Sequence, residues 1–449
     1  MKKEDQSYFY IILFHVLIGV LGYVLPFTAK IYGYSIFIFG LYYIIKNQNK
    51  NNEALVVAAY VVGSEVFLRM TGGNPLYEIS KYGVIVFILF GMYYSGFSKG
   101  AAPYWIYLLL LVPSVVISTF TLNFDTDLRT TIAFNISGPV CLGMASLYTF
   151  RRKILLTEMN RILFSMGLPI LSCMVYLTLY TPNVRDVVTS TQSNFETSGG
   201  YGPNQVATVL GLGMFIFFSR VILDSKTKLQ IVINLIIALN ITYRGMLTFS
   251  RGGVITGFLM IVLLVLFLYF KSNFGGRVKL NYIIVLLVLA SFATWTYTSF
   301  QTGGLINKRY ANQDAAGRVK ESQFTGREDI AQEEINIFLK NPIFGVGVGK
   351  GAEVREIDTG MKVLSHDEIT RTLAEHGSLG IVALLILFFT PLVLYLENKF
   401  NMFLLCFVAF WFLTINHAAM RTAAPAFVYS LSLLNVQLGS PRKVKNEEE

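Results

Sequence analysis

The chain has 449 residues, of which 54% are hydrophobic and 14% are charged, with 12 prolines and a formal net charge of +10. This composition excludes a disordered chain and an ordinary soluble protein. Segments of about 20 mostly apolar residues, the length that crosses a bilayer as a helix, follow one another almost end to end. We therefore predict an all-α polytopic membrane protein with about 12–14 transmembrane helices and one long loop that contains short helices.

The first apolar segment, residues 8–27, is followed by no small-residue cleavage site, so we interpret it as a retained helix and not as a signal peptide. Thirteen more apolar segments follow in chain order. They cover residues 31–45, 54–69, 83–97, 104–121, 131–150, 162–180, 204–221, 229–248, 253–270, 280–299, 377–396, 401–417 and 422–437. The short segments 31–45 and 401–417 fit tilted or re-entrant helices as well as full spans.

These segments predict four parts of the chain. Residues 1–197 and 198–299 are two sets of transmembrane helices, residues 300–376 are one long polar loop, and residues 377–449 are C-terminal transmembrane helices with a tail. In the first set, Glu65 and Arg69 lie four residues apart, and we interpret them as an ion pair on one helix in preference to a substrate site.

Lys and Arg are retained in short cytoplasmic loops, so their distribution predicts the orientation of the chain. With the N-terminus inside, 19 basic residues fall on the inner side, eight in short outer connections and ten in the 300–376 loop. We expect both termini in the cytoplasm and the long loop on the outer face. Most of the positive charge follows from this bias, so it does not indicate a nucleic-acid partner.

The long loop contains a helical pattern of its own. In TGREDIAQEEINIFLKNP, Thr325 and Glu328 have capping-box spacing, and the apolar positions share one face and stop before Pro342. We predict an amphipathic helix at the outer membrane surface. The following GVGVGKG fits a dinucleotide fingerprint in spacing alone, because neither a strand nor a βαβ unit surrounds it. We interpret it as a turn that lets two backbones come close.

The end of the loop, SHDEITRTLAEHGSLG, contains a candidate catalytic histidine. Ser365 and Glu368 form a second capping-box pattern, which predicts a helix start at Ser365 and places His366 in the first turn. The positive end of a helix disfavours a charged imidazole, so His366 fits a neutral general base. A surface histidine without a chemical role fits its position equally well. Asp367, Arg371 and Glu375 follow at i,i+4 spacing and predict a ladder of ion pairs.

Several arginines stand at the outer ends of predicted spans. Arg244 and Arg251 are seven residues apart in YRGMLTFSRGG, and they share a face if one helix runs through both. His417 and Arg421 form a second pair, four residues apart. Arginine holds phosphate oxygens in pairs, so these residues fit a pyrophosphate site, although membrane anchoring and helix packing remain open alternatives.

No metal or cofactor is expected from the sequence. The cysteines, Cys141, Cys173 and Cys406, lie in apolar segments without the spacing of a disulfide framework or a metal site. A neutral histidine base with several arginines is sufficient for group transfer from a pyrophosphate, in which a hydroxyl is activated and the leaving group is held.

Taken together, these motifs resemble the O-antigen ligase and O-antigen polymerase superfamily of bacterial inner membranes. The resemblance rests on LTFSRGG around Arg251, on GREDIAQEEINIFLKNPIFGVGVG from Gly326 and on SHDEITRTLAEHGSLG from Ser365. A weaker match is SGGYGPNQVATVLGL from Ser198. The likeness is specific for about residues 198–396 and general for the first 190 residues.

This resemblance implies transfer of a glycan from undecaprenyl pyrophosphate to an acceptor hydroxyl at the periplasmic face, with inversion and without a metal. It implies that His366 is the base and that Arg251 and Arg327 bind the pyrophosphate. The family often has asparagine after the histidine, where this chain has Asp367, and an acidic neighbour raises the pKa of a histidine. Other residues are supporting candidates on physical grounds alone. They are Arg244, Arg371, His417 and Arg421.

The acceptor stays open at this level. A ligase joins the glycan to a lipid A core, whereas a polymerase joins it to another lipid-linked repeat unit, and a ligase acting on protein uses the same chemistry. A polysaccharide transporter is disfavoured, because it would carry polar residues at mid-membrane and two related halves.

Overall fold

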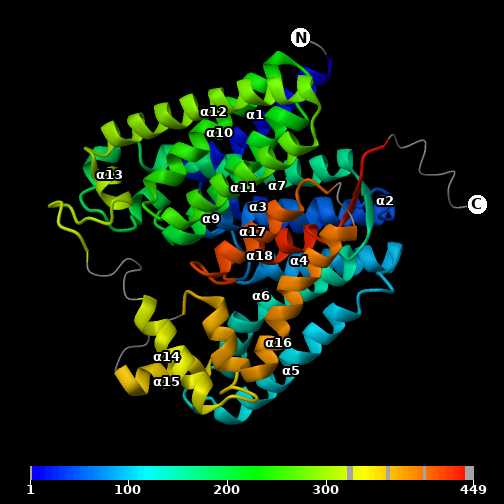
Figure 1. The fold of residues 1–449 in the computed structure, drawn as a ribbon, viewed down its shortest axis with the longest axis vertical. Helices are drawn as coiled ribbons and strands as arrows, with labels where there is room; N and C mark the ends of the chain where they lie inside the picture. The colour runs from blue at the N-terminus through cyan, green and yellow to red at the C-terminus, as the bar shows by residue number, and fades with distance from the viewer. Residues whose placement is uncertain (1–2, 321–326, 360–364, 398–400, 440–449) are drawn as a thin grey trace, which may run out of the picture.

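The structure is a computed structural model that describes residues 3–320, 327–359, 365–397 and 401–439. Helices make up most of it (Figure 1). Of the described residues, ten helices are long and apolar enough to cross a membrane. They are α1 (Lys3–Val24), α2 (Phe27–Asn47), α5 (Ala102–Thr121), α6 (Leu128–Thr149), α7 (Leu156–Tyr180), α9 (Pro203–Leu223), α10 (Lys228–Leu247), α11 (Arg251–Lys271), α12 (Phe274–Gln301) and α16 (Glu368–Glu397). The predicted all-α polytopic membrane protein is confirmed.

The remaining elements are shorter or less apolar. Four helices complete the bundle: α3 (Glu53–Met70), α4 (Ile79–Ser95), α17 (Leu404–Ile415) and α18 (Ala423–Leu431). Five short elements lie in connections: α8 (Val184–Val187), the 3-10 helix η1 (Glu196–Ser198), α13 (Leu305–Tyr310), α14 (Arg327–Lys340) and α15 (Lys350–Thr359).

One predicted span is wrong in its second half. The segment 422–437 is helical only as far as Leu431, and strand β2 (Asn435–Gln437) then pairs in parallel with β1 (Lys153–Leu155). The apolar side chains that suggested a longer helix are buried in this pairing, as Val436 shows. The small sheet joins the C-terminal end of the chain to the connection between α6 and α7.

Helices α7 and α9 are the most buried of the candidate spans, and α12 lies at the edge of the bundle. Glycines let α9 and α11 cross closely, because a Cβ added to Gly253 would lie 2.1 Å from the carbonyl oxygen of Ala207. This crossing holds the start of α11, and with it Arg251, against the start of α9.

The described parts of the long loop fold back onto the bundle (Figure 1). Helix α14 begins at Arg327, and Thr325 of the predicted capping box lies outside the described residues. The helix is amphipathic as predicted: Ile337 is buried and Asp329 is exposed, although Leu339 near its end is exposed as well. It packs against α16, so its buried side faces protein.

Helix α16 has a break at Gly377, whose φ of 61° lies in the left-handed region. A Cβ at this position would lie 2.6 Å from the carbonyl oxygen of Ile343. The break separates a polar segment, 368–376, from the apolar segment that follows, so the predicted start of the span at residue 377 coincides with a real change of direction.

Candidate active site

His366 lies just before α16 and not in its first turn. The predicted start at Ser365 is wrong, because Asp367 caps the helix: its Oδ1 accepts from the backbone N–H of Ile369 at 2.7 Å. Burial raises the pKa of Asp367 above its ordinary value, and the N–H donors of Ile369 and Thr370 oppose this shift. His366 is partly exposed, and its carbonyl oxygen accepts from the backbone N–H of Ala419 at 3.1 Å.

Glu334 of α14 holds the segment that carries His366. Its Oε2 accepts from Ser365 Oγ at 3.1 Å and from Thr370 Oγ1 at 2.6 Å, and its Oε1 pairs with Arg355 of α15 at 2.7 Å. Burial raises the pKa of Glu334, while the hydroxyl of Thr370 and the charge of Arg355 lower it. One buried carboxylate thus joins α14, α15 and both sides of His366.

Arg371 is enclosed by carboxylates. It pairs with Glu375 at 2.7 Å and with Glu368, and it also donates to the backbone oxygen of Asn135. Asp367 takes no part in the predicted ladder among the described contacts, because its side chain caps the helix. Because two buried carboxylates balance its charge, Arg371 is suited to stabilise the start of α16. These contacts do not support its predicted role as an anion-binding residue.

The GVGVG run is a close-packed turn, as interpreted from the sequence. Gly347 has a φ of 101°, and a Cβ there would lie 2.9 Å from the backbone nitrogen of Ser118 on α5. The backbone N–H of Gly349 donates to Glu375 Oε1 at 2.9 Å. The turn therefore locks the polar part of α16 against α5. Beside it a small cavity of about 30 Å³ is lined by Arg355, Arg371 and Arg421 among others.

Arg251 is the first residue of α11, and the helix is not continuous with α10. The helical conformation is interrupted at residues 248–250, where Phe249 has a φ of 56°. Arg244 and Arg251 therefore do not share a helix face. Arg244 is buried and donates to the carbonyl oxygen of Thr181 at 3.1 Å, which is a packing contact. Ser250 donates to Asn204 of α9 at 2.8 Å, and this bond fixes the turn before Arg251.

Two cations that the sequence analysis missed lie beside Arg251. Arg309 Nε donates to the carbonyl oxygen of Phe249 at 2.9 Å, and Arg251 donates to the carbonyl oxygen of Arg309 at 3.5 Å. Burial lowers the pKa of Lys320, and the charges of Arg309 and Arg251 lower it further, although Asp314 opposes them. We call Arg251, Arg309 and Lys320 the basic cluster. Mutual repulsion of this kind favours a bound anion.

An apolar groove of about 610 Å³ begins next to the basic cluster, between α10, α11 and α12. The end next to the basic cluster is lined by Val254, Trp295 and Tyr310. Burial raises the pKa of Tyr310 to about 12, and the charges of Arg251 and Arg309 oppose this rise. Along α11 its lining extends from Val254 to Leu266, a rise of about 18 Å. We call it the α11 groove.

The turn after α17 joins the two halves of the site. The ring of His417 lies over Gly252, next to Arg251, and its Nε2 contacts Thr208 Oγ1 at 3.2 Å. Two residues on, Ala419 binds the backbone of His366, and Arg421 donates to the carbonyl oxygen of Ser365. The predicted pair of His417 and Arg421 therefore bridges the elements that carry Arg251 and His366.

The structure also bears on the predictions for Glu65, Arg69 and Arg327. Glu65 and Arg69 form the expected ion pair at 2.7 Å. The backbone of Arg327 begins α14, but its side chain lies outside the described residues, so its assignment to the pyrophosphate stays a prediction. Among the residues that the structure describes, no group of three or more His, Cys, Asp or Glu could hold a metal ion.

Comparison with protein families bears on residues 233–385, which match the O-antigen ligase family. This segment is similar to an O-antigen ligase domain. It contains the basic cluster, Glu334 and His366, whereas His417 and Arg421 lie beyond it. The match confirms the resemblance to the O-antigen ligase superfamily and supports, in general terms, an O-antigen ligase or polymerase type of function. No curated protein matches the chain.

Proposed function

We propose that the protein transfers a glycan from undecaprenyl pyrophosphate to an acceptor hydroxyl at the periplasmic face of a bacterial inner membrane. The observation that carries the proposal is the position of the basic cluster at the end of the α11 groove. A ligand that satisfies both features has a multiply charged anionic head and a long apolar tail. A polyprenyl pyrophosphate has this form, and the O-antigen ligase domain supports a donor of this class.

In the proposed reaction, His366 takes the proton from the acceptor hydroxyl. The hydroxyl oxygen then forms a bond to the anomeric carbon of the glycan, from the side opposite to the pyrophosphate. The bond between that carbon and the pyrophosphate oxygen breaks, and its electron pair leaves with the polyprenyl pyrophosphate. The product is inverted, and no oxidant or further reactant is needed.

Positive side chains neutralise the leaving group in this proposal. Arg251 and Arg309 can each present two N–H groups to phosphate oxygens, and Lys320 adds an ammonium. Because this charge is supplied by the chain itself, the proposed transfer needs no metal. Arg327 belongs to the same site by resemblance alone.

The lipid A core is the proposed acceptor, and a lipid-linked repeat unit is the alternative for a polymerase. The glycolipid profile of a deletion strain tests both. Free core with accumulated long lipid-linked polymer indicates a ligase, and core that bears a single repeat unit indicates a polymerase. An unchanged profile would contradict the proposed function.

A further inference from the structure

The ring of His417 touches the start of α11. It lies over Gly252, because a Cβ added to that glycine would lie 2.7 Å from the ring. Ring Nδ1 lies 2.8 Å from the carbonyl oxygen of Leu413 on α17, and Nε2 lies 3.2 Å from Thr208 Oγ1 on α9. Three helices thus fix the ring beside Arg251, with a polar contact at each ring nitrogen.

The hydrogen atoms around this ring allow two charge states. The carbonyl oxygen of Leu413 can only accept, so Nδ1 carries a hydrogen. Thr208 has one hydroxyl hydrogen and two acceptors for it, which are His417 Nε2 and the carbonyl oxygen of Asn204 at 2.8 Å. If the hydrogen points to Nε2, the ring is neutral. If it points to Asn204, Nε2 donates to Thr208 and the ring carries a positive charge. The ring can therefore gain a proton and keep a hydrogen bond at both nitrogens.

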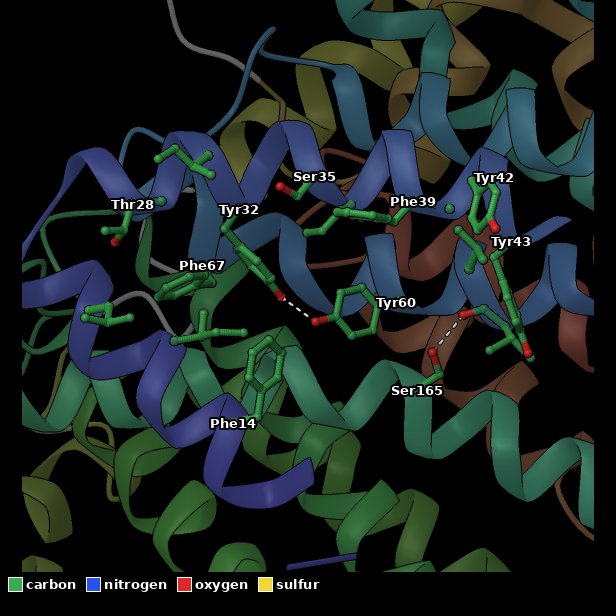
Figure 2. Close-up of a pocket in the computed structure, with 18 residues that line it drawn as sticks. Phe14, Thr28, Tyr32, Ser35, Phe39, Tyr42, Tyr43, Tyr60, Phe67 and Ser165 are labelled. Carbon is green, nitrogen blue, oxygen red and sulfur yellow. Dashed lines mark hydrogen bonds between the residues drawn. The ribbon is translucent and has the colours of Figure 1, made fainter. Parts of the chain in front are cut away.

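His15 has the opposite arrangement, next to Tyr60, which lines a second apolar groove between α1, α2 and α3 (Figure 2). Its Nδ1 lies 2.8 Å from the carbonyl oxygen of Ile11, and its Nε2 lies 2.9 Å from Tyr60 Oη. Figure 2 shows the bond of 2.8 Å in which Tyr32 donates to Tyr60. If both nitrogens of His15 donated, one tyrosine hydrogen would have no acceptor among the described residues. The ring of His15 is therefore suited to the neutral state alone.

The charged groups that face the turn of His417 come from neighbouring helices and the long loop. They are Arg251 of α11, Arg309 of α13, Lys320, Glu368 and Arg371 of α16, and Glu65 and Arg69 of α3, together with Arg421 of the turn itself. Glu368 accepts from the backbone N–H of Met420 and Glu65 from that of Ala423, and each carboxylate is paired with the arginine of its own helix. Arg251, by contrast, stands next to the ring, and the positive end of α11 adds to its charge. Without an anion, these charges oppose a second proton on the ring.

A bound pyrophosphate reverses this balance. Its negative charges next to Arg251 favour the charged ring, and the hydroxyl of Thr208 can turn toward Asn204. We propose that binding of the donor's pyrophosphate at the basic cluster adds one proton from solvent to His417 Nε2, and that this proton returns to solvent when the polyprenyl pyrophosphate leaves. This inference rests on the proposed function, because it assigns a further group to the same donor site. Since histidine changes charge between about pH 5 and 8, donor binding should weaken as the pH rises through this range.

Calorimetry measures this proton directly. Farnesyl pyrophosphate, a probe with the same head group and a short apolar tail, is titrated into the full-length protein in detergent at about pH 7, where a histidine can change charge. Two buffers with different heats of ionisation are used, and the difference in heat gives the number of protons taken up for each ligand bound. His417→Gln keeps an uncharged polar side chain and should take up fewer protons than the wild type, by up to about one. His15→Gln is the matched control and should behave like the wild type.

Thr208 supplies a test that leaves the histidine in place. Thr208→Val keeps the shape of the side chain and removes the hydroxyl, so the charged ring loses its acceptor at Nε2. A hydrogen bond from a charged donor is the stronger one, so this change should favour the neutral ring and lower the proton uptake. Thr208→Ser keeps the hydroxyl and should restore the uptake of the wild type. The affinity of the wild type for farnesyl pyrophosphate should fall by up to about tenfold for each unit of rising pH, and that of Thr208→Val should fall less.

Three outcomes would contradict the proposal. Equal proton uptake by the wild type and His417→Gln would overturn this inference and leave the proposed donor site in place. Loss of the uptake in Lys320→Met or His366→Gln, together with full uptake in His417→Gln, would do the same, because the proton would then belong to another group of the site. If the wild type did not bind farnesyl pyrophosphate, the proposed class of donor would be overturned together with this inference.

Discussion

Ala419 donates its backbone N–H to the carbonyl oxygen of His366 at 3.1 Å, across 53 residues of chain. The same turn places the ring of His417 over Gly252, beside Arg251. One turn thus contacts the segments of both the proposed base and Arg251, through the backbone of Ala419 and the side chains of His417 and Arg421.

His366→Ala should lower glycan transfer by at least about 100-fold without loss of membrane insertion, because a positioned general base contributes about that much or more. The measurement is surface glycan in a deletion strain that carries the variant, together with the amount of protein in the membrane. His376→Leu is the matched control, since His376 is buried and its Nδ1 has no hydrogen-bond partner among the described residues. Normal transfer by His366→Ala would remove the catalytic assignment.

Arg309→Ala should weaken use of the lipid-linked donor by roughly 10- to 100-fold, the effect of one charged hydrogen bond, and Arg251→Ala should do the same. The measurement is the donor concentration that gives half-maximal transfer by purified protein. Arg318→Ala in the same loop is the control, because Arg318 is exposed and pairs with Asp314. If Arg309→Ala behaves like this control, Arg309 does not belong to the donor site.

Glu334→Ala should loosen the segment around His366, because it leaves Arg355 as a buried charge without its carboxylate. Loss of one partner of such a pair costs about 3–5 kcal/mol. Hydrogen exchange should rise in α14, α15 and the start of α16, and transfer should fall with it. Asp329→Ala, on the exposed side of the same helix, should change neither. Unchanged exchange at the start of α16 would show that Glu334 does not hold this segment.

The pH dependence of stability should change in Glu334→Gln. Burial raises the folded-state pKa of Glu334 above its ordinary value of 4.5, so the folded protein binds the proton more tightly than the unfolded chain does. The contribution of this carboxyl to stability is therefore fully present below pH 4.5 and is lost as pH rises through the raised pKa. Thermal unfolding between pH 4 and pH 7 should show a weaker loss of stability with rising pH in Glu334→Gln than in the wild type.

Ala316→Cys should react with a membrane-impermeant thiol reagent added to intact spheroplasts, because Ala316 is exposed in the loop expected on the periplasmic side. The native cysteines are buried and should give little background. Lys226→Cys, in the connection between α9 and α10 at the other end of the bundle, should react only after the membrane is opened. The reverse pattern would overturn the predicted orientation.

Much of this arrangement could be predicted from the sequence where the signal is local. Apolar length predicted the helices, and the turn character of GVGVG followed from its glycines. The helix start at Ser365 was wrong because Asp367 Oδ1 accepts from the backbone N–H groups of Ile369 and Thr370, whereas Ser365 Oγ accepts from the N–H of Asp367, ahead of the helix. Ser365 Oγ also donates to Glu334 of α14, a contact that cannot be read from the local sequence because α14 is distant in the chain.

Arg309 and Lys320 could not be recognised in the same way. They lie in the long loop without a periodic pattern, and only the folded chain brings them to the start of α11. The basic residues of long loops also carry no information on sidedness, so the charge bias that predicts the orientation does not point to them. Glu334 was hidden for a related reason, since an acidic residue on an amphipathic helix is normally solvated.

The small β1–β2 sheet has a consequence for how this protein can be divided. The sheet pairs the segment after α18 with the connection after α6. Between residue 385, where the family match ends, and strand β2, the chain contains α17, α18 and the turn with Ala419. The segment recognised by family, residues 233–385, therefore ends before the backbone that supports its own histidine. A fragment cut at those limits would carry His366 and Arg251 but would lack the turn with Ala419 and strand β2, so we expect it to hold these two residues in place less firmly than the full chain does.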